Sequence, residues 1–429
     1  MSVIEFKSID KLKTQVINQL VFKKSKTILF IQPYGACLSL LLHGLSKGYQ
    51  IIIFSAQKDL RVVSETILSS VALTIIIDTA NEESVLSCSM FLQEIIQIHA
   101  VVPGFEYFVP LAAKVNESLN LPGVPLNKVM QLRRKDVMRL CLREANIAVP
   151  RFAIIQSIAE LDQAIEEIGF PAICKPVDAA GSVYVRKVND KKEARAAVLA
   201  ILENKYLLWG YELSRIVLFE EYIEGKEYSL EGVVQQGNII HFSLTEKIVS
   251  DEIEFIEIGH IVNSPISLMD KKIIENYVNQ ILIILGADNC PFHAEVRLAQ
   301  NKPILMEIAA RLAGDKIGDL INLSGSVNYF DYVYAAYGGE QLPDISQSGY
   351  PTGIRFFYRP QIASYQKIEG TETLKQAPIE ELLFYYQPGH PIPDFPKPLR
   401  RLGHVIAKNK DYVVLEKMLN EIDEMIVFE

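Results

Sequence analysis

The feature that most constrains the fold is a regular alternation of apolar runs with helical stretches near the amino terminus. Residues 27–56, TILFIQPYGACLSLLLHGLSKGYQIIIFSA, read in order as a buried strand, a Gly-containing turn, a helix and a second strand. The runs VALTIIIDTA (71–80) and AVVPGF (100–105) continue the pattern, with helical sequence between them. Strands that alternate with helices form parallel sheets covered on both faces. We therefore predict a doubly wound α/β domain.

The turn QPYGA at residues 32–36 lacks the Gly-x-Gly-x-x-Gly spacing of a dinucleotide site. A tight strand-to-helix turn is the favoured interpretation, and nicotinamide binding is disfavoured.

The length of 429 residues exceeds the roughly 250–300 at which a single core stops growing, so several domains are expected. We assign the N-terminal α/β domain to residues 1–126. Residues 127–225 are predicted to hold a basic amphipathic linker helix, reaching to about residue 150, and a central lid subdomain. Residues 226–429 read as an α+β unit with antiparallel strands, whose closing lobe begins at about residue 346.

Composition narrows the class of protein. The 49% hydrophobic and 22% charged residues are typical of a soluble globular protein, and the net charge of -9 argues against general nucleic-acid binding. The five cysteines are scattered without a CxxC spacing, which indicates reduced thiols in a cytoplasmic protein. We expect no export signal, because the amino-terminal sequence MSVIEFKSIDKLKTQ lacks an uninterrupted apolar h-region. We expect no membrane span, because no apolar run reaches about 18 residues.

Two acidic residues in adjacent apolar segments carry the first chemical signal. FHAEVRL (292–298) and PILMEIAAR (303–311) read as two strands of a hairpin, with His293, Glu295 and Arg297 on one face of the first strand. An odd-length loop near residues 300–302 would set Glu295 opposite Glu307, whereas an even loop would send the two acids to opposite faces. We predict the odd loop.

Facing carboxylates repel each other unless a cation lies between them. Mg²⁺ would be such a cation if the carboxylates bind it and leave coordination positions free for phosphate oxygens. The alternative is a pair of solvated acids, and Glu295 and Glu307 alone favour neither interpretation. Glu307 and Arg311 lie four residues apart, and the simplest interpretation of that spacing is an ordinary salt bridge of about 0.2–0.5 kcal/mol.

Further upstream, Lys175 ends an apolar strand and precedes AAGS, in which Gly181 and Ser182 would let backbone amides approach phosphate. The alternative is that the aliphatic part of the Lys175 side chain is buried and its ammonium group simply reaches solvent. The stretch 216–228, IVLFEEYIEGKEY, would form a wall for a purine ring, although acids on a surface hairpin are commoner than ribose ligands.

These pieces form one pattern when they are taken in order. Lys135, KP at 175–176 with DAAGS, EEYIEGKEYS (220–229), HAEVR (293–297) and MEIAARLAG (306–314) follow each other as in ATP-grasp enzymes. The chain resembles that superfamily over nearly its whole length. With GHIVNSP (259–265), the motifs are most similar to those of L-amino acid ligases of the bacilysin-synthetase kind.

The resemblance implies an ATP-grasp fold and a role for each matching residue. Lys135, Lys175 and Ser182 would bind the phosphates of ATP. Glu220, Glu221 and Ile223 would contact the adenine, and Glu227 would contact the ribose. Glu295 and Glu307 would bind magnesium ions, two being expected and Mn²⁺ being an alternative. Arg311 would stabilise the acyl phosphate and the tetrahedral intermediate. The implied substrate contacts are His260, His293, Arg311, Gly314 and Asp315.

The implied activity is ATP-dependent carboxylate–amine ligation of amino acids or similar molecules, through an acyl phosphate, with release of ADP and phosphate. A carboxylase-like or purine-pathway ATP-grasp enzyme, or a nucleotide-binding protein without turnover, stays open as an alternative. Three positions depart from the family pattern: Ala309 replaces a metal-side Asn, Tyr184 replaces a loop Gly, and Asp315 replaces a bulky aromatic. The partners expected are small molecules, without nucleic acid or membrane, and a homodimer is a reasonable default.

Overall fold

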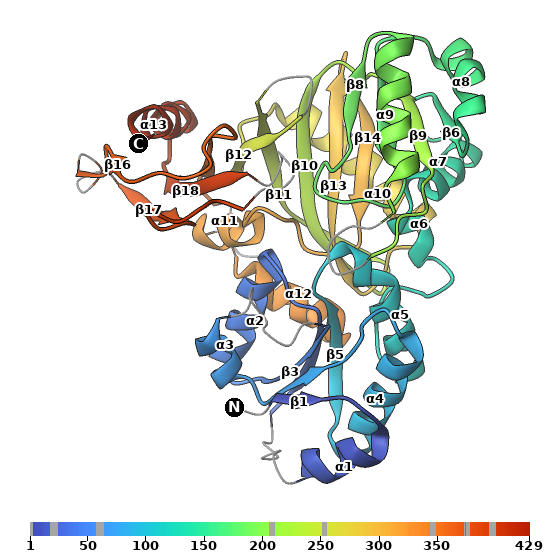
Figure 1. Ribbon diagram of the computed structural model, residues 1–429, viewed down its shortest axis with the longest axis vertical. Helices are drawn as coiled ribbons and strands as arrows, with labels where there is room; N and C mark the ends of the chain where they lie inside the picture. The colour runs from blue at the N-terminus through green and yellow to red at the C-terminus, as the bar shows by residue number, and fades with distance from the viewer. Residues whose placement is uncertain are drawn as a thin grey trace.

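Three large sheets, beside one short two-stranded pair, organise the computed structural model. The structure describes residues 3–17, 25–56, 64–205, 211–250, 255–325, 327–343, 349–372, 374, 378–393 and 400–429. Figure 1 shows the N-terminal sheet in blue, the central lobe in green, and a large sheet that runs from the lobe to the carboxyl terminus. No helix of these residues is long and apolar enough to cross a membrane.

The N-terminal sheet has the order β1-β4-β3-β2-β5, and all of its pairs are parallel. Its strands are β1 (Val3–Glu5), β2 (Thr27–Ile31), β3 (Gln50–Ser55), β4 (Leu73–Ile76) and β5 (Ile98–Pro103). The helices between them are α1 (Ile9–Ile17), α2 (Ala36–Ser46), α3 (Glu65–Ser70) and α4 (Glu82–Ile95), and α5 (Val109–Ser118) follows β5. Both faces of β2 and β3 are buried, as is usual for parallel strands. The predicted doubly wound domain is confirmed.

The central lobe is built on a four-stranded antiparallel sheet, β6-β9-β7-β8. Its strands are β6 (Phe152–Ile155), β7 (Ala172–Pro176), β8 (Arg186–Val188) and β9 (Val217–Glu221), and its helices are α8 (Leu161–Ile168) and α9 (Lys191–Glu203). The single linker helix expected up to residue 150 is wrong. Two helices, α6 (Val129–Arg133) and α7 (Lys135–Glu144), meet at Arg134, whose backbone is extended. The Lys135 amide then donates to Val177 O of the lobe, at 2.9 Å.

The large sheet has the order β14-β13-β10-β11-β12-β15-β18-β17 in the described residues, with antiparallel pairing throughout. Its strands are β10 (Lys226–Gln235), β11 (Asn238–Val249), β12 (Glu257–Val262), β13 (Cys290–Ala299), β14 (Lys302–Ala309), β15 (Thr352–Tyr358), β17 (Ile379–Phe384) and β18 (Arg401–Lys408). The strands of the expected closing lobe therefore extend the same sheet (Figure 1). The domain boundaries at 126 and 225 stay predictions.

Helices cover the apolar face of this sheet and leave the other face polar. Helix α10 (Leu268–Leu285) and helix α12 (Tyr329–Gly338) share one core with the sheet strands β10, β13 and β14. The remaining elements after β14 are α11 (Ile317–Leu323), α13 (Tyr412–Met425) and the short pair β16 (Ile368–Glu369) with β19 (Val427–Phe428). Helix α12 also contacts the N-terminal domain, where Tyr334 Oη donates to Leu40 O at 2.7 Å. This helix therefore joins the first domain to the large sheet.

The hairpin of β13 and β14 brings Glu295 opposite Glu307, as predicted, but by a different route. The loop has two residues, Gln300 and Asn301, both with positive φ (49° and 62°), as in the tight turns that suit hairpins. The predicted odd-length loop is therefore wrong. A β-bulge opposite the step from Glu295 to Val296 leaves Met306 as the extra residue of β14, and it shifts the register by one. The bulge replaces the odd loop as the cause of the pairing.

Gly104 lets the loop after β5 pass close to the end of β2. A Cβ on Gly104 would lie 2.0 Å from Gln32 O and 2.5 Å from the Pro33 Cα, both backbone atoms. We expect Gly104→Ala to lower the free energy of unfolding by about 2–3 kcal/mol, because the backbone must shift. Denaturant unfolding measures this. Gly338→Ala is the control, since its Cβ meets only the Glu340 side chain at 3.3 Å; equal losses in the two variants would contradict the clash.

Candidate active site

A cavity of about 1630 Å³ lies where the three sheets meet. Its lining comes from the loop after β2, the end of β5, the central lobe, the polar face of the large sheet and the closing lobe. With one exception, His260, every site residue predicted from the sequence lines this cavity. The volume exceeds the roughly 300–1,000 Å³ of a single small-molecule site, so it suits a nucleotide together with other substrates.

The predicted phosphate-binding lysines lie at the junction of the lobe and the hairpin. Lys135 Nζ lies 3.0 Å from Glu307 Oε1 and donates to Ala179 O at 2.8 Å. Lys175 Nζ lies 2.5 Å from Glu220 Oε2. Burial lowers the pKa of Lys175, with Glu220 opposing that effect. Both ammonium groups are thus held at the wall of the cavity by carboxylates, and their contacts with ATP stay predictions.

Arg139, which the sequence interpretation missed, ties this corner together. It is fully buried in α7; its Nε contacts Glu220 Oε1 at 2.5 Å and its Nη2 donates to Met306 O at 2.9 Å. Lys175 Nζ also donates to Met306 O, at 3.3 Å. The carbonyl exposed by the β-bulge therefore accepts two cationic donors, which fixes the hairpin against the lobe.

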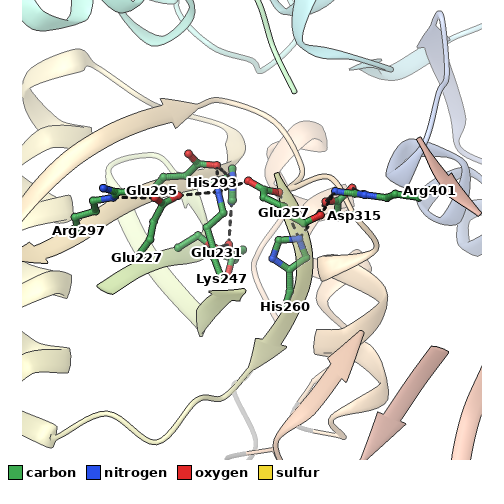
Figure 2. A network of polar contacts seen from close by, with 11 residues as sticks. Glu227, Glu231, Lys247, Glu257, His260, His293, Glu295, Arg297, Asp315 and Arg401 are labelled. Atoms are coloured by element: carbon green, nitrogen blue, oxygen red, sulfur yellow. Dashed lines mark hydrogen bonds and ion pairs between the residues drawn. The ribbon is translucent and has the colours of Figure 1, made fainter. Parts of the chain in front are cut away.

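Lys247 is the second residue that the sequence interpretation missed. Its ammonium lies 3.2 Å from Glu227, 2.5 Å from Glu257 and 2.6 Å from Glu295, and its side chain is 2% exposed (Figure 2). Burial lowers the pKa of Lys247, but the three carboxylates outweigh it and raise the pKa well above its usual value. A sequence signal for Lys247 was nevertheless available: the period-two alternation in LTEKIV places Thr245 and Lys247 on the same face of the strand, the polar one.

His293 supports Glu295 from the same strand. Its Nδ1 lies 2.9 Å from Glu231 Oε1 and its Nε2 lies 3.1 Å from Glu295 Oε1 (Figure 2). Burial lowers the pKa of His293, but the hydrogen bonds with Glu231 and Glu295 raise it to about 9. The ring nitrogens are thus occupied by two acids, and the predicted substrate contact of His293 is not tested by this geometry.

Arg311 is oriented by an acid from the N-terminal domain. Its Nε donates to Glu106 Oε2 at 2.5 Å and its Nη1 donates to Leu312 O at 2.6 Å. Burial raises the pKa of Glu106, but Arg311, Arg133 and Lys135 outweigh it and hold the pKa below its usual value. Glu106 follows β5, at the carboxyl edge of the parallel sheet where ligands of such sheets bind, and that position was the signal available in the sequence.

The substrate end predicted from His260 and Asp315 is joined to the closing lobe. His260 Nε2 lies 3.0 Å from Asp315 Oδ2, and Arg401 donates to both Asp315 oxygens at 2.6 and 2.8 Å (Figure 2). Burial raises the pKa of Asp315, but Arg401 and His260 bring it well below its usual value. Arg401 also packs over the Phe356 ring, 3.8 Å from its centroid. Sequence interpretation missed Arg401, which lies 86 residues further along the chain.

The predicted adenine and ribose positions lie along β9 and β10. Glu221 accepts from the Arg151 amide and side chain, while the Ile223 carbonyl accepts from Arg297 at 2.8 Å. Glu227 lies 3.0 Å from Arg297 Nε. Ser182 lines the cavity in the loop before β8, where it has φ of 55°. Their roles in nucleotide binding remain predictions.

The paired carboxylates have the chemistry that divalent cations require. Glu295 and Glu307 are opposite each other on adjacent strands, and in this structure each contacts an ammonium group, of Lys247 and Lys135 respectively. Mg²⁺ and Mn²⁺ prefer carboxylate oxygens as ligands, and the cavity beside this pair leaves space for phosphate oxygens. Ala309 offers no further ligand on this strand.

Comparison with known proteins agrees with this geometry. The family model of the ATP-grasp domain matches residues 168–319. The L-amino acid ligase from Bacillus licheniformis superposes with a TM-score of 0.78 over 95% of this chain and all of that one, at 21% sequence identity. The chain thus has the ATP-grasp fold and carries an ATP-grasp domain.

Sequence relatives narrow the resemblance further. Alanine–anticapsin ligase of Bacillus subtilis is 28% identical over 252 residues, or 54% of this chain and 52% of that protein. Dapdiamide A synthase of Enterobacter agglomerans is 28% identical over 221 residues, or 51% of each. The chain therefore spans about half the length of these curated relatives. The predicted resemblance to ATP-grasp carboxylate–amine ligases is confirmed.

Arg139 allows a direct test of the junction at Met306. We expect Arg139→Met to lower the free energy of unfolding by about 3–5 kcal/mol, because Glu220 would be left as a buried carboxylate with half its compensation. Denaturant unfolding measures the loss. Arg195→Met, at an exposed position of α9, is the control and should change stability by about 0.5 kcal/mol or less. Similar losses in the two variants would show that Arg139 is not an anchor.

Proposed function

We propose that the protein is an ATP-dependent ligase that joins a carboxylate to an amine. The substrates are amino acids or amino-acid-like molecules, and an acyl phosphate forms on the way to an amide or peptide bond, with release of ADP and phosphate. The observation that carries the proposal is the facing pair Glu295 and Glu307, with Arg311 four residues further on, in one cavity. A protein that only binds nucleotide has little use for all three.

The nucleotide belongs on the lobe side of the cavity. Lys135 and Lys175 would contact the ATP phosphates, with the Ser182 loop closing over them. The segment from Glu220 to Ile223 would hold adenine, and Glu227 would accept from the ribose hydroxyls. The Glu220 carboxylate is already bound by Arg139 and Lys175, so its part at the adenine falls to its backbone.

Glu295 and Glu307 would hold Mg²⁺, two ions being proposed. When bound, magnesium neutralises and orients the phosphates of ATP. The protein's own contribution is to keep the Glu295 carboxylate ionised: burial raises its pKa, but Lys247 and His293 outweigh burial and hold that pKa well below its usual value. Lys135, 3.0 Å from Glu307, is positioned to turn to phosphate oxygens within the same pocket.

Arg311 would stabilise the negative charge that develops on the acyl phosphate and on the tetrahedral intermediate. Its pKa is lowered by burial but raised overall by Glu106 and Glu307, so it stays charged. Because Glu106 holds Nε and Leu312 O holds Nη1, the guanidinium is oriented before the substrate arrives. The substrate itself would lie beyond Arg311, against Gly314 and Asp315, and the buried ring of His260 would act on it through its contact with Asp315.

The direct experiment is ADP or phosphate release with Mg·ATP across pairs of L-amino acids and simple amines, with product mass spectrometry. Amine-dependent release with an amide product supports ligation. Bicarbonate dependence without an amide, or nucleotide binding without turnover, would overturn the proposal.

Arg311→Ala isolates the charge that acts on the reacting carbonyl. We expect kcat to fall by about 10²-fold or more, because one preorganised donor to a developing oxyanion is lost. ATP affinity, measured by calorimetry, should stay within about threefold, because nucleotide contacts lie on the lysine side. Lys410→Ala, outside the cavity lining, is the control for general effects of losing a cation. Retained turnover in Arg311→Ala would refute the assigned role.

A further inference from the structure

The closing lobe carries a chain of hydrogen bonds that starts at the cavity and leads away from it. Tyr385 lines the cavity, and its hydroxyl lies 2.8 Å from Nδ1 of His404. The other ring nitrogen, His404 Nε2, lies 3.0 Å from Glu381 Oε1. Lys316 Nζ contacts both oxygens of Glu381, at 3.0 and 3.1 Å. The function proposed above uses none of these four residues.

The register of β17 and β18 explains why these side chains meet. His404 of β18 is paired with Leu383 of β17. Glu381 and Tyr385 lie two residues before and after Leu383, so all three project from one face of the strand. His404 is thus flanked by an acid on one side and a phenol on the other. Its side chain has no exposed surface, whereas Tyr385 is 42% exposed.

The direction of the hydrogen bonds follows from the charges around His404. Burial raises the pKa of Glu381, but Lys316 and His404 outweigh it and hold it below its usual value, so the carboxylate only accepts. Burial lowers the pKa of His404, which leaves a neutral ring. Nε2 must then donate to Glu381, Nδ1 is an acceptor, and the Tyr385 hydroxyl donates to Nδ1. The oxygen lone pairs of Tyr385 are left to face the cavity.

Charged groups from each neighbouring element influence this ring. Glu381 raises the pKa of His404, whereas Lys316, before α11, and Arg401, on the same strand, lower it. The neighbour on β15 is the uncharged ring of Phe356, 6.1 Å away. Tyr385 is also close enough to Arg401 and Asp315 to be influenced by their charges. The chain therefore ends at the substrate side of the cavity, beside the Asp315–Arg401 pair.

Ligation to an amino acid needs a proton acceptor at this end, because an amine in neutral water is protonated and an ammonium group has no lone pair for attack. We propose that Tyr385, His404 and Glu381 form a proton relay that deprotonates the incoming ammonium group; the inference rests on the proposed function. Tyr385 is its catalytic residue, and His404 and Glu381 act through it. The relay is specific for an amine substrate that arrives as a cation.

The relay balances its protons and electrons. The ammonium N–H proton passes to Tyr385 Oη as the Tyr385 hydroxyl proton passes to His404 Nδ1, and Glu381 stabilises the imidazolium. The freed nitrogen lone pair forms the bond to the acyl carbon, and the carbon–oxygen bond to phosphate breaks with its electron pair on phosphate. The leaving phosphate takes the second amine proton. The proton on His404 returns to water through Tyr385 after the product leaves.

Hydroxylamine separates this relay from the rest of the reaction, because it is largely unprotonated at neutral pH and still attacks acyl phosphates. With Mg·ATP and an L-amino acid that gives wild-type turnover, hydroxamate formation is compared with dipeptide formation. We expect Tyr385→Phe to lower kcat for the dipeptide by about 10²-fold and to leave hydroxamate formation within about threefold. The dipeptide defect should shrink as pH rises, since free amine then forms in solution.

His404→Gln should show the same selective loss, and Tyr350→Phe, an exposed tyrosine outside the cavity lining, should show none. Because Tyr385 is itself partly exposed, Tyr385→Phe should fold normally, and unfolding measurements verify that. An equal loss with both nucleophiles, or no loss with either, overturns the relay while leaving ligation intact. Absence of hydroxamate from the wild-type protein would instead overturn the proposed function, and the relay with it.

Discussion

The carbonyl of Met306 is the point on which the arrangement of the site depends. The β-bulge exposes it, and the guanidinium of Arg139 and the ammonium of Lys175 both donate to it. The same extra residue turns Glu307 to the face of Glu295. One irregular position in β14 therefore determines the register of the two carboxylates, anchors helix α7 through Arg139, and places Lys175 of the central lobe. An unbroken ladder after a two-residue turn would have directed Glu307 into the apolar core.

The polar face of the large sheet buries several charged side chains together, each beside a group of opposite charge. Glu227, Glu257 and Glu295 share the ammonium of Lys247, and Glu231 and Glu295 share the ring of His293. Each ion buried alone would be strongly unfavourable, and breaking a pair leaves an uncompensated charge. Each ion pair of the network therefore depends on the others, and Lys247 and His293 together hold the pKa of Glu295 well below its usual value. A cation or a phosphate that enters the cavity therefore meets charged side chains that are already in place, and it replaces one of their present partners.

How far the sequence predicts this molecule depends on the range of each interaction. The alternation in residues 27–105 predicted the parallel sheet, because strand and helix periods are local properties. The pairing of Glu295 with Glu307 was predicted for the wrong reason, since nothing local in Met306 announces a bulge. Lys247 was detectable from its period-two spacing with Thr245, and Glu106 from its place after β5. Arg139 and Arg401 were not detectable, because their partners lie 167 and 86 residues away and only packing reveals them.

The continuity of the large sheet into the closing lobe separates two tasks. Contacts assigned to the nucleotide and to magnesium come from α7, from the central lobe and from β10, β13 and β14. Asp315, Arg401 and Tyr385 come from segments after β14. Arg401 of β18 binds both carboxylate oxygens of Asp315. Substitutions in the closing lobe can therefore reshape the substrate end without moving the carboxylates or the lysines. The nucleotide end and the substrate end of the cavity are both bordered by strands of one hydrogen-bonded sheet, β14 and β18. The strand spacing therefore fixes the distance between these strands, and substitutions in the closing lobe change only the side chains that they present.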